Sequence, residues 1–419
     1  DRSPSRGLGD VYKRQGFLAL CFMSYTLGMD MGIVMAKGVI LGVICCITVL
    51  PSLILICDKA LEKTMHKDFL PNMDGISKFI VNHRAVFLIL FAVLLVPSIY
   101  GQINTNVYYN LTDSLPHDLN SAIANTKLSE EYNMASTHIV MCRSDMSSKE
   151  VSKMTAEMEK VDGVSFALGF DSLVGPMIPQ EIIPESITNT LKSENWQMII
   201  VGSDYKPASD EVNSQIEKLS SIIKNYDESG MVIGEAAATK DLISITDHDF
   251  QVVNIVSIAA IFVIIFIALK SISLPIILVA VIEFAITVNM GLPFYIKTTI
   301  PFIASVVIGT IQLGATVDYA ILMTTRYKTE RISGKSKYDA VTIALKTSIK
   351  SIMVSALGFF AATFGVGMYS NVDMISQLCT LMSRGAIISM VTVICVLPSM
   401  LMLLDKPIRA TTLGMKTNN

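Results

Sequence analysis

Long apolar runs alternate with polar segments along this 419-residue chain. A helix needs about 20 apolar residues to cross the hydrocarbon core of a bilayer. Runs of roughly this length occupy residues 36–57, 84–102, 251–269, 273–295, 301–325, 348–369 and 377–404. A further apolar run, 16–28, is too short for a complete span. The pattern predicts a polytopic α-helical membrane protein.

A polar region of domain size separates the spans 84–102 and 251–269. Its short apolar runs predict strands, and its 3–4 periodicity predicts helices capped by Ser148 and Ser209. The predicted strands are Thr137–Met141, Gly163–Leu168, Gln197–Val201 and Met231–Ile233, and the predicted helices are 119–133, 148–160 and 208–225. We expect a small α+β domain with βαβ units. The stretch 171–195, with three prolines, carries no clear pattern.

The distribution of basic residues predicts which loops face the cytoplasm, because cytoplasmic loops are enriched in Lys and Arg. The loop 326–350 and the stretch 58–84 are rich in both, and the tail after 404 adds three more. If these basic loops face the cytoplasm and each successive span crosses the membrane once, the polar region lies outside the cell. That region, 104–250, is acidic, with 23 Asp plus Glu against 10 Lys plus Arg.

Composition excludes several classes of protein. Hydrophobic residues make up 51% of the chain and charged residues 16%, against roughly 25% charged in soluble domains. Six of the seven cysteines lie in apolar runs, and neither they nor the five histidines have the spacing of metal ligands. We therefore expect no cofactor, no metal site and no disulfide framework. The slightly acidic balance gives no reason to expect a nucleic-acid partner, and no GxxxxGK[ST] motif indicates ATP as an energy source.

An internal repeat links the two ends of the chain. Residues 35–59 and 382–406 align without gaps at about ten identities in twenty-five positions, including Pro51 with Pro398 and Asp58 with Asp405. Repeated membrane halves are a mark of transporters. We infer that 16–59 ends a first half whose earlier spans are missing. Residues 1–15 share no pattern with the rest of the chain, and we interpret them as a non-native leader.

These patterns together predict the domain organisation of the chain. Residues 1–15 are the leader, 16–59 form the last two spans of a first repeat (the first of them partial), and 60–83 form a cytoplasmic linker. A span (84–102), an extracytoplasmic domain (103–250), a five-helix bundle (251–404) and a cytoplasmic tail (405–419) follow.

A motif in the span 301–325 indicates a family. Gly314-Ala-Thr-Val-Asp318-Tyr319 is followed by Arg326-Tyr327-Lys328, in a half built of one span, an outside domain and five more spans. This arrangement resembles the MMPL group (mycobacterial membrane protein large type) of the resistance-nodulation-division superfamily. The resemblance implies a ferredoxin-like, porter-type outside domain and a bacterial cell-membrane exporter driven by the proton-motive force. It implies partners as well: a lipid, drug or other hydrophobic substrate, protons, membrane lipids and the missing N-terminal half. Without that half, this chain is not expected to transport alone.

Asp318 is the leading candidate for proton transfer. A carboxylate at a helix centre costs about 2.5–3.5 kcal/mol on insertion scales, so it survives where a function or a partner requires it. Desolvation would favour a proton on this carboxyl, and Tyr319 could donate a hydrogen bond to the carboxylate. Gly314, one turn earlier, would admit a second helix. The alternative is a protonated carboxyl that only bonds a neighbouring helix.

Small and polar residues form stripes along two successive spans. Ser305, Gly309, Gln312, Thr316 and Tyr319 share one helical face, and Thr347, Ser351, Ser355, Gly358 and Ala362 share another. Facing stripes of this kind pack closely and can hold a hydrogen-bonded relay. Gln312, Ser351 and Ser355 are therefore further relay candidates, whereas Gly309 and Thr316 are expected to serve helix packing. Packing alone would also explain both stripes.

Glu283 is a second acid within a span. It could contact the Asp318 helix or face a substrate path, or it could be a neutral side chain bonded to Gln312 or to a carbonyl. Two other functions compete with transport on the same residues. A receptor or scaffold of the sterol-sensing type shares this architecture but has no need of an Asp-Tyr pair. An intramembrane aspartyl protease needs two facing carboxylates, usually one in a GxGD setting, which is absent here. We predict a transporter half and no enzyme.

The predicted topology can be tested by labelling with a membrane-impermeant thiol reagent in intact cells. A cysteine introduced within 104–250 should react from outside, and one introduced within 326–346 should react only after the membrane is opened. Equal labelling of both in intact cells would contradict the orientation.

Overall fold

The computed structural model describes residues 20–24, 26–64, 73–109, 118–170 and 191–415. Its contacts divide the chain into two units. The helical unit comprises residues 1–107 and 246–419, and the α/β unit comprises Tyr108–Ile245. The leader 1–15 and most of the stretch 171–195 lie outside the described residues.

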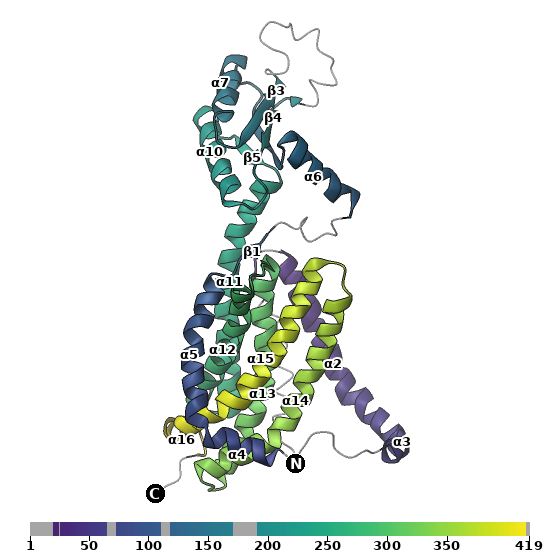
Figure 1. Cartoon of the computed structure of the whole chain (residues 1–419), viewed down its shortest axis with the longest axis vertical. Coiled ribbons are helices and arrows are strands. Elements are labelled where there is room, and N and C mark those ends of the chain that lie inside the picture. Colours follow the sequence, from purple (N-terminus) through teal and green to yellow (C-terminus); the bar gives the residue numbers. More distant parts are fainter. Residues whose placement is uncertain (1–19, 25, 65–72, 110–117, 171–190, 416–419) are drawn as a thin grey trace. The chain divides into compact units, whose positions relative to one another are not determined.

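Within the described residues, seven helices are long and apolar enough to cross a membrane. They are α2 (Thr26–Ile56), α5 (Arg84–Ile103), α11 (Glu235–Leu269), α12 (Ser273–Ile296), α13 (Phe302–Ile332), α14 (Lys337–Tyr369) and α15 (Asp373–Leu403) (Figure 1). Each covers one of the seven predicted spans to within one residue. The prediction of a polytopic helical membrane protein is confirmed.

Several helices extend beyond the apolar runs that predicted them. Helix α11 begins sixteen residues before residue 251, because its first turns are polar and carry no hydrophobic run. Helix α2 begins at Thr26, ten residues before the predicted start. Of the partial span 16–28, the structure describes a single 3-10 turn, η1 (Leu20–Phe22), followed by the start of α2.

Helix α12 packs against α5, α13 and α15. Its contact with α5 is a close approach of two backbones. A Cβ on Gly101 would lie 2.5 Å from the carbonyl oxygen of Gly291, and a Cβ on Gly291 would lie 2.4 Å from that of Ser98. Only glycine allows this separation. The Thr105 hydroxyl, one turn after Gly101, lies 2.7 Å from the Gly101 carbonyl oxygen of its own helix and 3.0 Å from the Met290 carbonyl oxygen of α12.

Short helices lie next to the long ones. Helix α4 (Asp74–Asn82) buries Ile80 and Val81 in the helical core. Tyr338 at the start of α14 donates to Asn82 at 2.9 Å. Two further short helices among the described residues, α3 (Asp58–Lys63) and α16 (Asp405–Thr411), follow α2 and α15 along the chain.

The sequence repeat has a structural counterpart. Helices α2 and α15 each contain the aligned proline, Pro51 or Pro398, and each is followed by a short helix that begins at the aligned aspartate, Asp58 or Asp405. The resemblance between residues 35–59 and 382–406 therefore extends to local structure. Strands β1 (Val107–Tyr108) and β6 (Ile300–Pro301) form a separate two-stranded sheet.

The α/β unit contains a four-stranded sheet. Its strands are β2 (Ser136–Arg143), β3 (Val164–Gly169), β4 (Trp196–Ser203) and β5 (Met231–Ile233), in spatial order β3-β4-β2-β5. All three neighbouring pairs are antiparallel, with Val140 opposite Ile199 and Leu168 opposite Ile200. Helix α7 (Ser148–Met158) connects β2 to β3, and α10 (Asp210–Tyr226) connects β4 to β5. The chain order is thus βαββαβ, and the four predicted strands are confirmed.

The helices of this unit follow the predicted periodicities. Helix α10 is capped by Ser209, whose hydroxyl accepts from the Val212 amide at 3.1 Å. The predicted cap Ser148 is wrong by one position: Ser147 caps α7, because it forms a reciprocal capping box with Glu150. Helix α6 (Asn120–Tyr132) buries none of its residues, as its weak apolar pattern allows.

One histidine lies in the core of the α/β unit. His138 on β2 is fully buried, and its Nε2 lies 3.1 Å from the Gln215 side-chain oxygen on α10. Burial penalises the imidazolium ion and lowers the pKa of His138 below 6.5, the ordinary value for histidine, against the smaller opposing effect of Gln215. At pH values between this lowered pKa and 6.5, His138 therefore binds fewer protons in the folded protein than in the unfolded chain.

This linkage predicts that the α/β unit loses stability as the pH falls below about 6.5, because the unfolded chain then gains a proton that the folded state resists. Trp196, the single tryptophan, lies in this unit and reports its unfolding in the whole chain. Urea transitions followed by its fluorescence should move to lower urea between pH 7 and pH 5. His138→Gln should flatten this dependence, and His83→Gln, at an exposed site, should not. An unchanged slope in His138→Gln would contradict the prediction.

Candidate functional site

Asp318, the acid predicted to transfer protons, belongs to α13 of the helical unit. Asp318 is close to the midpoint of α13, is half-buried, and has one carboxylate oxygen that solvent does not reach. The span that carries it is the most buried of the seven helices described above. The carboxyl group is therefore held in the interior of the helical unit.

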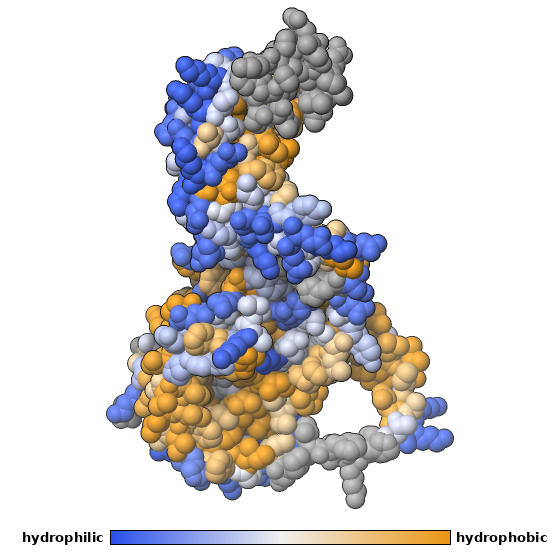
Figure 2. All heavy atoms as spheres, turned by 45° about the horizontal axis from the view of Figure 1, so that its top comes forward, coloured by the Kyte–Doolittle hydropathy of each residue, from blue (hydrophilic) through white to orange (hydrophobic). Residues whose placement is uncertain are grey.

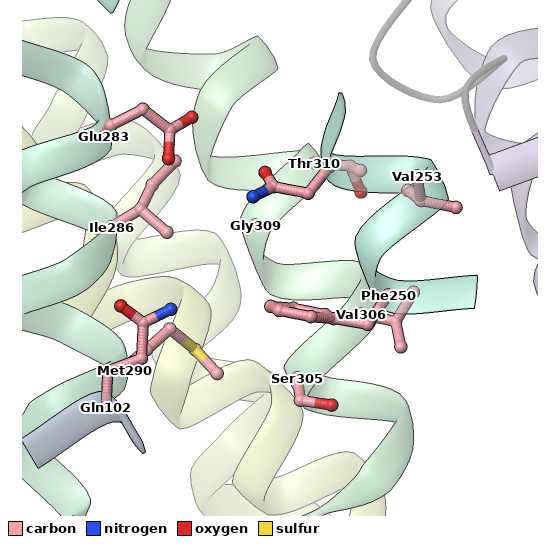
Figure 3. A pocket seen from close by; sticks show the side chains of 11 residues that line it. Gln102, Phe250, Val253, Glu283, Ile286, Met290, Ser305, Val306, Gly309 and Thr310 are labelled. Atoms are coloured by element: carbon pink, nitrogen blue, oxygen red, sulfur yellow. The ribbon is translucent and has the colours of Figure 1, made fainter. Parts of the chain in front are cut away.

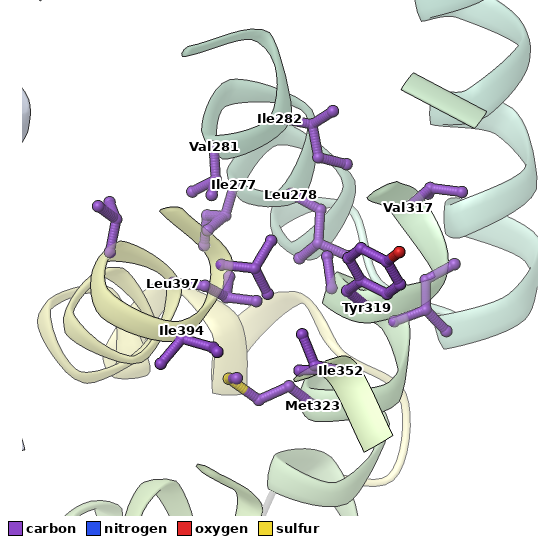
Figure 4. Close-up of a cluster of buried hydrophobic side chains, with 14 of the residues drawn as sticks. Ile277, Leu278, Val281, Ile282, Val317, Tyr319, Met323, Ile352, Ile394 and Leu397 are labelled. Atoms are coloured by element: carbon purple, nitrogen blue, oxygen red, sulfur yellow. The ribbon is translucent and has the colours of Figure 1, made fainter. Parts of the chain in front are cut away.

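Tyr319 lies in the hydrophobic core beside this acid. Its side chain is 6% exposed and belongs to the cluster that contains Leu278, Val317 and Ile352 (Figure 4). Packing of the ring against aliphatic side chains fixes its position. Adjacent residues of a helix point about 100° apart, so Asp318 and Tyr319 leave α13 in different directions.

Gln312 is the centre of a buried hydrogen-bond network. Its carbonyl oxygen accepts from the Asn289 side chain of α12 at 2.8 Å, and its amide nitrogen donates to the Ser389 hydroxyl of α15 at 2.9 Å. Gln312, Asn289 and Ser389 are at most 4% exposed. The network joins three helices through side chains that would be costly to bury unpaired. We refer to Asn289, Gln312, Arg384 and Ser389 as the amide network.

Arg384 adds a charge to this network. Its guanidinium donates from Nε to the Asn289 side-chain oxygen at 2.8 Å and from Nη2 to the Asn289 carbonyl at 2.7 Å. Gly385 makes room for the network, because a Cβ there would lie 2.7 Å from both Asn289 Nδ2 and Gln312 Oε1. Sequence analysis missed Asn289, Arg384 and Ser389. Their common signal is a polar side chain inside an apolar run, as for Glu283.

The predicted stripe on α14 does not face α13. Ser351 and Ser355 are exposed, together with Thr347, Gly358 and Ala362. The opposite side of α14, which includes Ala344, Ser348, Ile352 and Ala356, is the buried one. The expectation of two facing stripes is wrong, because a different face of α14 packs against the core of the helical unit.

The packing roles assigned to Gly309 and Gly314 are also corrected, whereas that of Thr316, which is 2% exposed, stays a prediction. A Cβ placed on Gly309 or Gly314 meets no atom of the described residues within 4 Å, so neither glycine makes a close helix contact there. The Thr316 hydroxyl donates to the Gln312 carbonyl of its own helix at 2.6 Å. The close contacts of the helical unit lie instead at Gly101, Gly291 and Gly385.

Glu283 lies apart from the amide network. Figure 3 shows its side chain extending from α12 into a space bounded on the other side by Phe250, Val253 and Ser305. Its Oε1 atom is buried and has no hydrogen-bond partner among the described residues. The alternative in which Gln312 bonds Glu283 is wrong, because both ends of the Gln312 amide are bonded elsewhere.

An ion pair fixes the other end of α13. Asp405 of α16 accepts from Arg331 in a two-pronged contact, with Nε to Oδ1 and Nη2 to Oδ2 both at 2.8 Å. The Tyr327 hydroxyl donates to the same carboxylate. Tyr327 belongs to the Arg-Tyr-Lys motif, and Asp405 belongs to the repeat. The two sequence signals therefore meet in one buried contact.

Among the described residues, the α/β unit has an open apolar sheet face. Helices α7 and α10 cover one face, where Val140, Ile199 and Leu219 are buried. The alternate residues of these strands point to the opposite face of the sheet, and they are half-buried or exposed although they are hydrophobic. The open sheet face comprises Ile139, Met141, Phe166, Leu168, Met198, Ile200, Met231 and Ile233. Figure 2 shows hydrophobic residues at the surface of this unit. Contiguous patches of this kind mark sites of interaction.

Seven apolar helices among the described residues, a half-buried acid and an interhelical polar network define a polytopic helical membrane protein with ionisable groups in its membrane core. The MMPL family matches residues 111–411, so the chain belongs to the MMPL family and is a membrane protein of the transporter type. It is also similar to YdgH of Bacillus subtilis (strain 168), whose name describes it only as a membrane protein. Identity is 22% over 217 residues, which cover 50% of this chain and 23% of YdgH.

Matched glycine substitutions test the amide network. Gly385→Ala should lower the thermal midpoint of the helical signal in circular dichroism, because overpacking a tight site costs about 1–3 kcal/mol. Gly358→Ala makes the same change at a helical position with open space and should be neutral or stabilising, since alanine favours a helix by up to about 1 kcal/mol. Equal midpoints for the two variants would contradict the role given to Gly385.

Proposed function

We propose that this chain is the C-terminal part of a proton-driven exporter of lipids, drugs or other hydrophobic compounds in a bacterial cell membrane. Membership of the MMPL family supports this class. The observation that carries the proposal is Asp318, a half-buried acid near the middle of a largely buried span. The aligned part of YdgH is about a quarter of that protein. The activity of the complete exporter is therefore part of the proposal and is not inferred from YdgH.

Asp318 couples proton flow to helix movement through its charge. An ionised carboxylate in a span is costly by about 2.5–3.5 kcal/mol on insertion scales, and protonation removes that cost. Loading and unloading a proton therefore changes the free energy of any arrangement that exposes or buries this group. The amide network and the Arg331–Asp405 ion pair hold α13 to its neighbours, so a movement of α13 would be passed to α12, α15 and α16.

The α/β unit is proposed to be the extracytoplasmic, porter-type domain. Its βαββαβ order and the strand order β3-β4-β2-β5 support a ferredoxin-like fold. The open sheet face suits a hydrophobic substrate, because methionine and aliphatic side chains form an adaptable apolar surface. Acidic residues in the surrounding region are consistent with a position outside the membrane, away from the anionic cytoplasmic leaflet.

A matching half is the proposed partner of the helical unit. Helix α2 repeats the sequence and local structure of α15, yet its hydrophobic window is not buried by the described residues. Gly38 aligns with Gly385, and no described atom lies within 4 Å of a Cβ placed on it. By symmetry with Gly385, we expect Gly38 to pack against helices of a first half.

Export by the complete protein tests the role of Asp318. Asp318→Asn keeps the size of the side chain but cannot bind and release a proton, so proton-driven export should be lost while expression and membrane insertion remain normal. Asp373→Asn makes the same change at the exposed start of α15 and should leave export close to wild type. Normal export by Asp318→Asn would remove this acid from the mechanism.

A further inference from the structure

Arg384 carries a positive charge on the outward side of α15. Its side chain is half-buried, and Thr380, one turn earlier on the same helical face, is exposed. Arg384 is eleven residues after the start of α15, and its partner Asn289 is seven residues before the end of α12. These separations are about 16 Å and about 10 Å along the two helix axes. The guanidinium therefore lies between the ends of these helices and their midpoints, at the surface of the helical unit.

The amide network holds one edge of the Arg384 guanidinium and leaves its other edge open. A guanidinium has five N–H hydrogens in a planar fork. Nε and Nη2 each donate one hydrogen to Asn289, to the side-chain oxygen at 2.8 Å and to the backbone carbonyl at 2.7 Å. The two hydrogens of Nη1 and the second hydrogen of Nη2 have no partner among the described residues. They form the end-on edge of the fork, which matches the two oxygens of a carboxylate or phosphate group.

The charge of Arg384 is not neutralised within the part of the chain that the structure describes. Both acceptors on Asn289 are uncharged, and so are Gln312 and Ser389, the other members of the amide network. None of the ion pairs between described residues includes Arg384. A cation in a span is costly, and that cost falls when the bilayer thins locally and headgroups approach the charge. The open edge of Arg384 is therefore suited to an anion that comes from the membrane.

The surface around Arg384 has the polarity of a lipid molecule. Toward the midpoint of α15, the same face continues with Ile388, which is half-buried, and Val391, which is 50% exposed. Helix α5 contacts both α12 and α15, and only 6% of its most apolar window is buried. A charged group near the helix end is thus followed by apolar surface deeper in the span. An acidic headgroup with acyl chains fits this order, whereas a free inorganic anion would lose its hydration and gain one partner.

We propose that Arg384 binds the acidic headgroup of one membrane lipid, a phosphate or a carboxylate, with the acyl chains against α15 and α5. The amide network fixes the guanidinium for this contact, because Asn289 holds the side-on edge and turns the end-on edge outward. Binding of the lipid does not depend on the proposed export of hydrophobic compounds.

Native mass spectrometry of the purified chain in detergent tests the proposal with three lipids. Phosphatidylglycerol offers a phosphate, oleate offers a carboxylate, and diacylglycerol has no charge. Wild type should retain one molecule of an acidic lipid in preference to diacylglycerol. The preferred acidic lipid distinguishes a phospholipid from a fatty acid. Arg384→Gln should lower the apparent affinity for acidic lipid at least tenfold and leave that for diacylglycerol unchanged. Lys297→Gln, the matched control, removes an exposed positive charge at the same end of α12 and should bind as wild type does.

Asn289→Asp tests the same contact with Arg384 still present. The introduced carboxylate would pair with the guanidinium inside the protein, so acidic lipid should bind more weakly than to wild type. Circular dichroism of each variant checks that its helices are intact. Equal retention of acidic lipid by wild type, Arg384→Gln and Asn289→Asp overturns the proposal. Equal retention of acidic lipid and diacylglycerol by wild type overturns it too. Loss of export in Asp318→Asn is independent of all these outcomes.

Discussion

The helical unit depends on one constraint: every polar group within an apolar span needs a partner, because the hydrocarbon of the bilayer offers none. The amide network satisfies this constraint for Asn289, Gln312 and one edge of the Arg384 guanidinium by joining α12, α13 and α15. Beyond the apolar part of α13, Arg331 and Asp405 form a two-pronged ion pair that ties this helix to α16. Polar groups thereby determine which helices are neighbours, and aliphatic side chains fill the remaining space.

Two acids in the same unit are placed differently. Asp318 lies near the middle of a helix that is tied to its neighbours on both sides of it, by Gln312 and by Arg331. Glu283 lies beside a cavity with hydroxyl oxygens and without a cationic side chain in its described lining. The first position suits a group whose charge moves a helix.

Spans and strands could be predicted from the sequence because each depends on a local pattern. Apolar length located the seven helices, and short apolar runs located β2 to β5. Side-chain partners depend on which helix lies alongside, which no local pattern contains. Ser351 and Ser355 share a helical face as predicted, yet that face is exposed. Gly314 was expected at a close contact, whereas Gly101, Gly291 and Gly385 make such contacts. Similarly, Asn289 and Arg384 can be recognised as hydrogen-bond partners only when α12 and α15 are known to be adjacent.

Proton flux in vesicles tests the central claim most directly, namely that a buried acid links proton movement to export. The complete exporter, reconstituted with a hydrophobic substrate and a pH gradient, should move substrate and protons in a fixed ratio. Both fluxes should stop when an ionophore collapses the gradient. Substrate export that continues at an undiminished rate without a gradient would contradict the account.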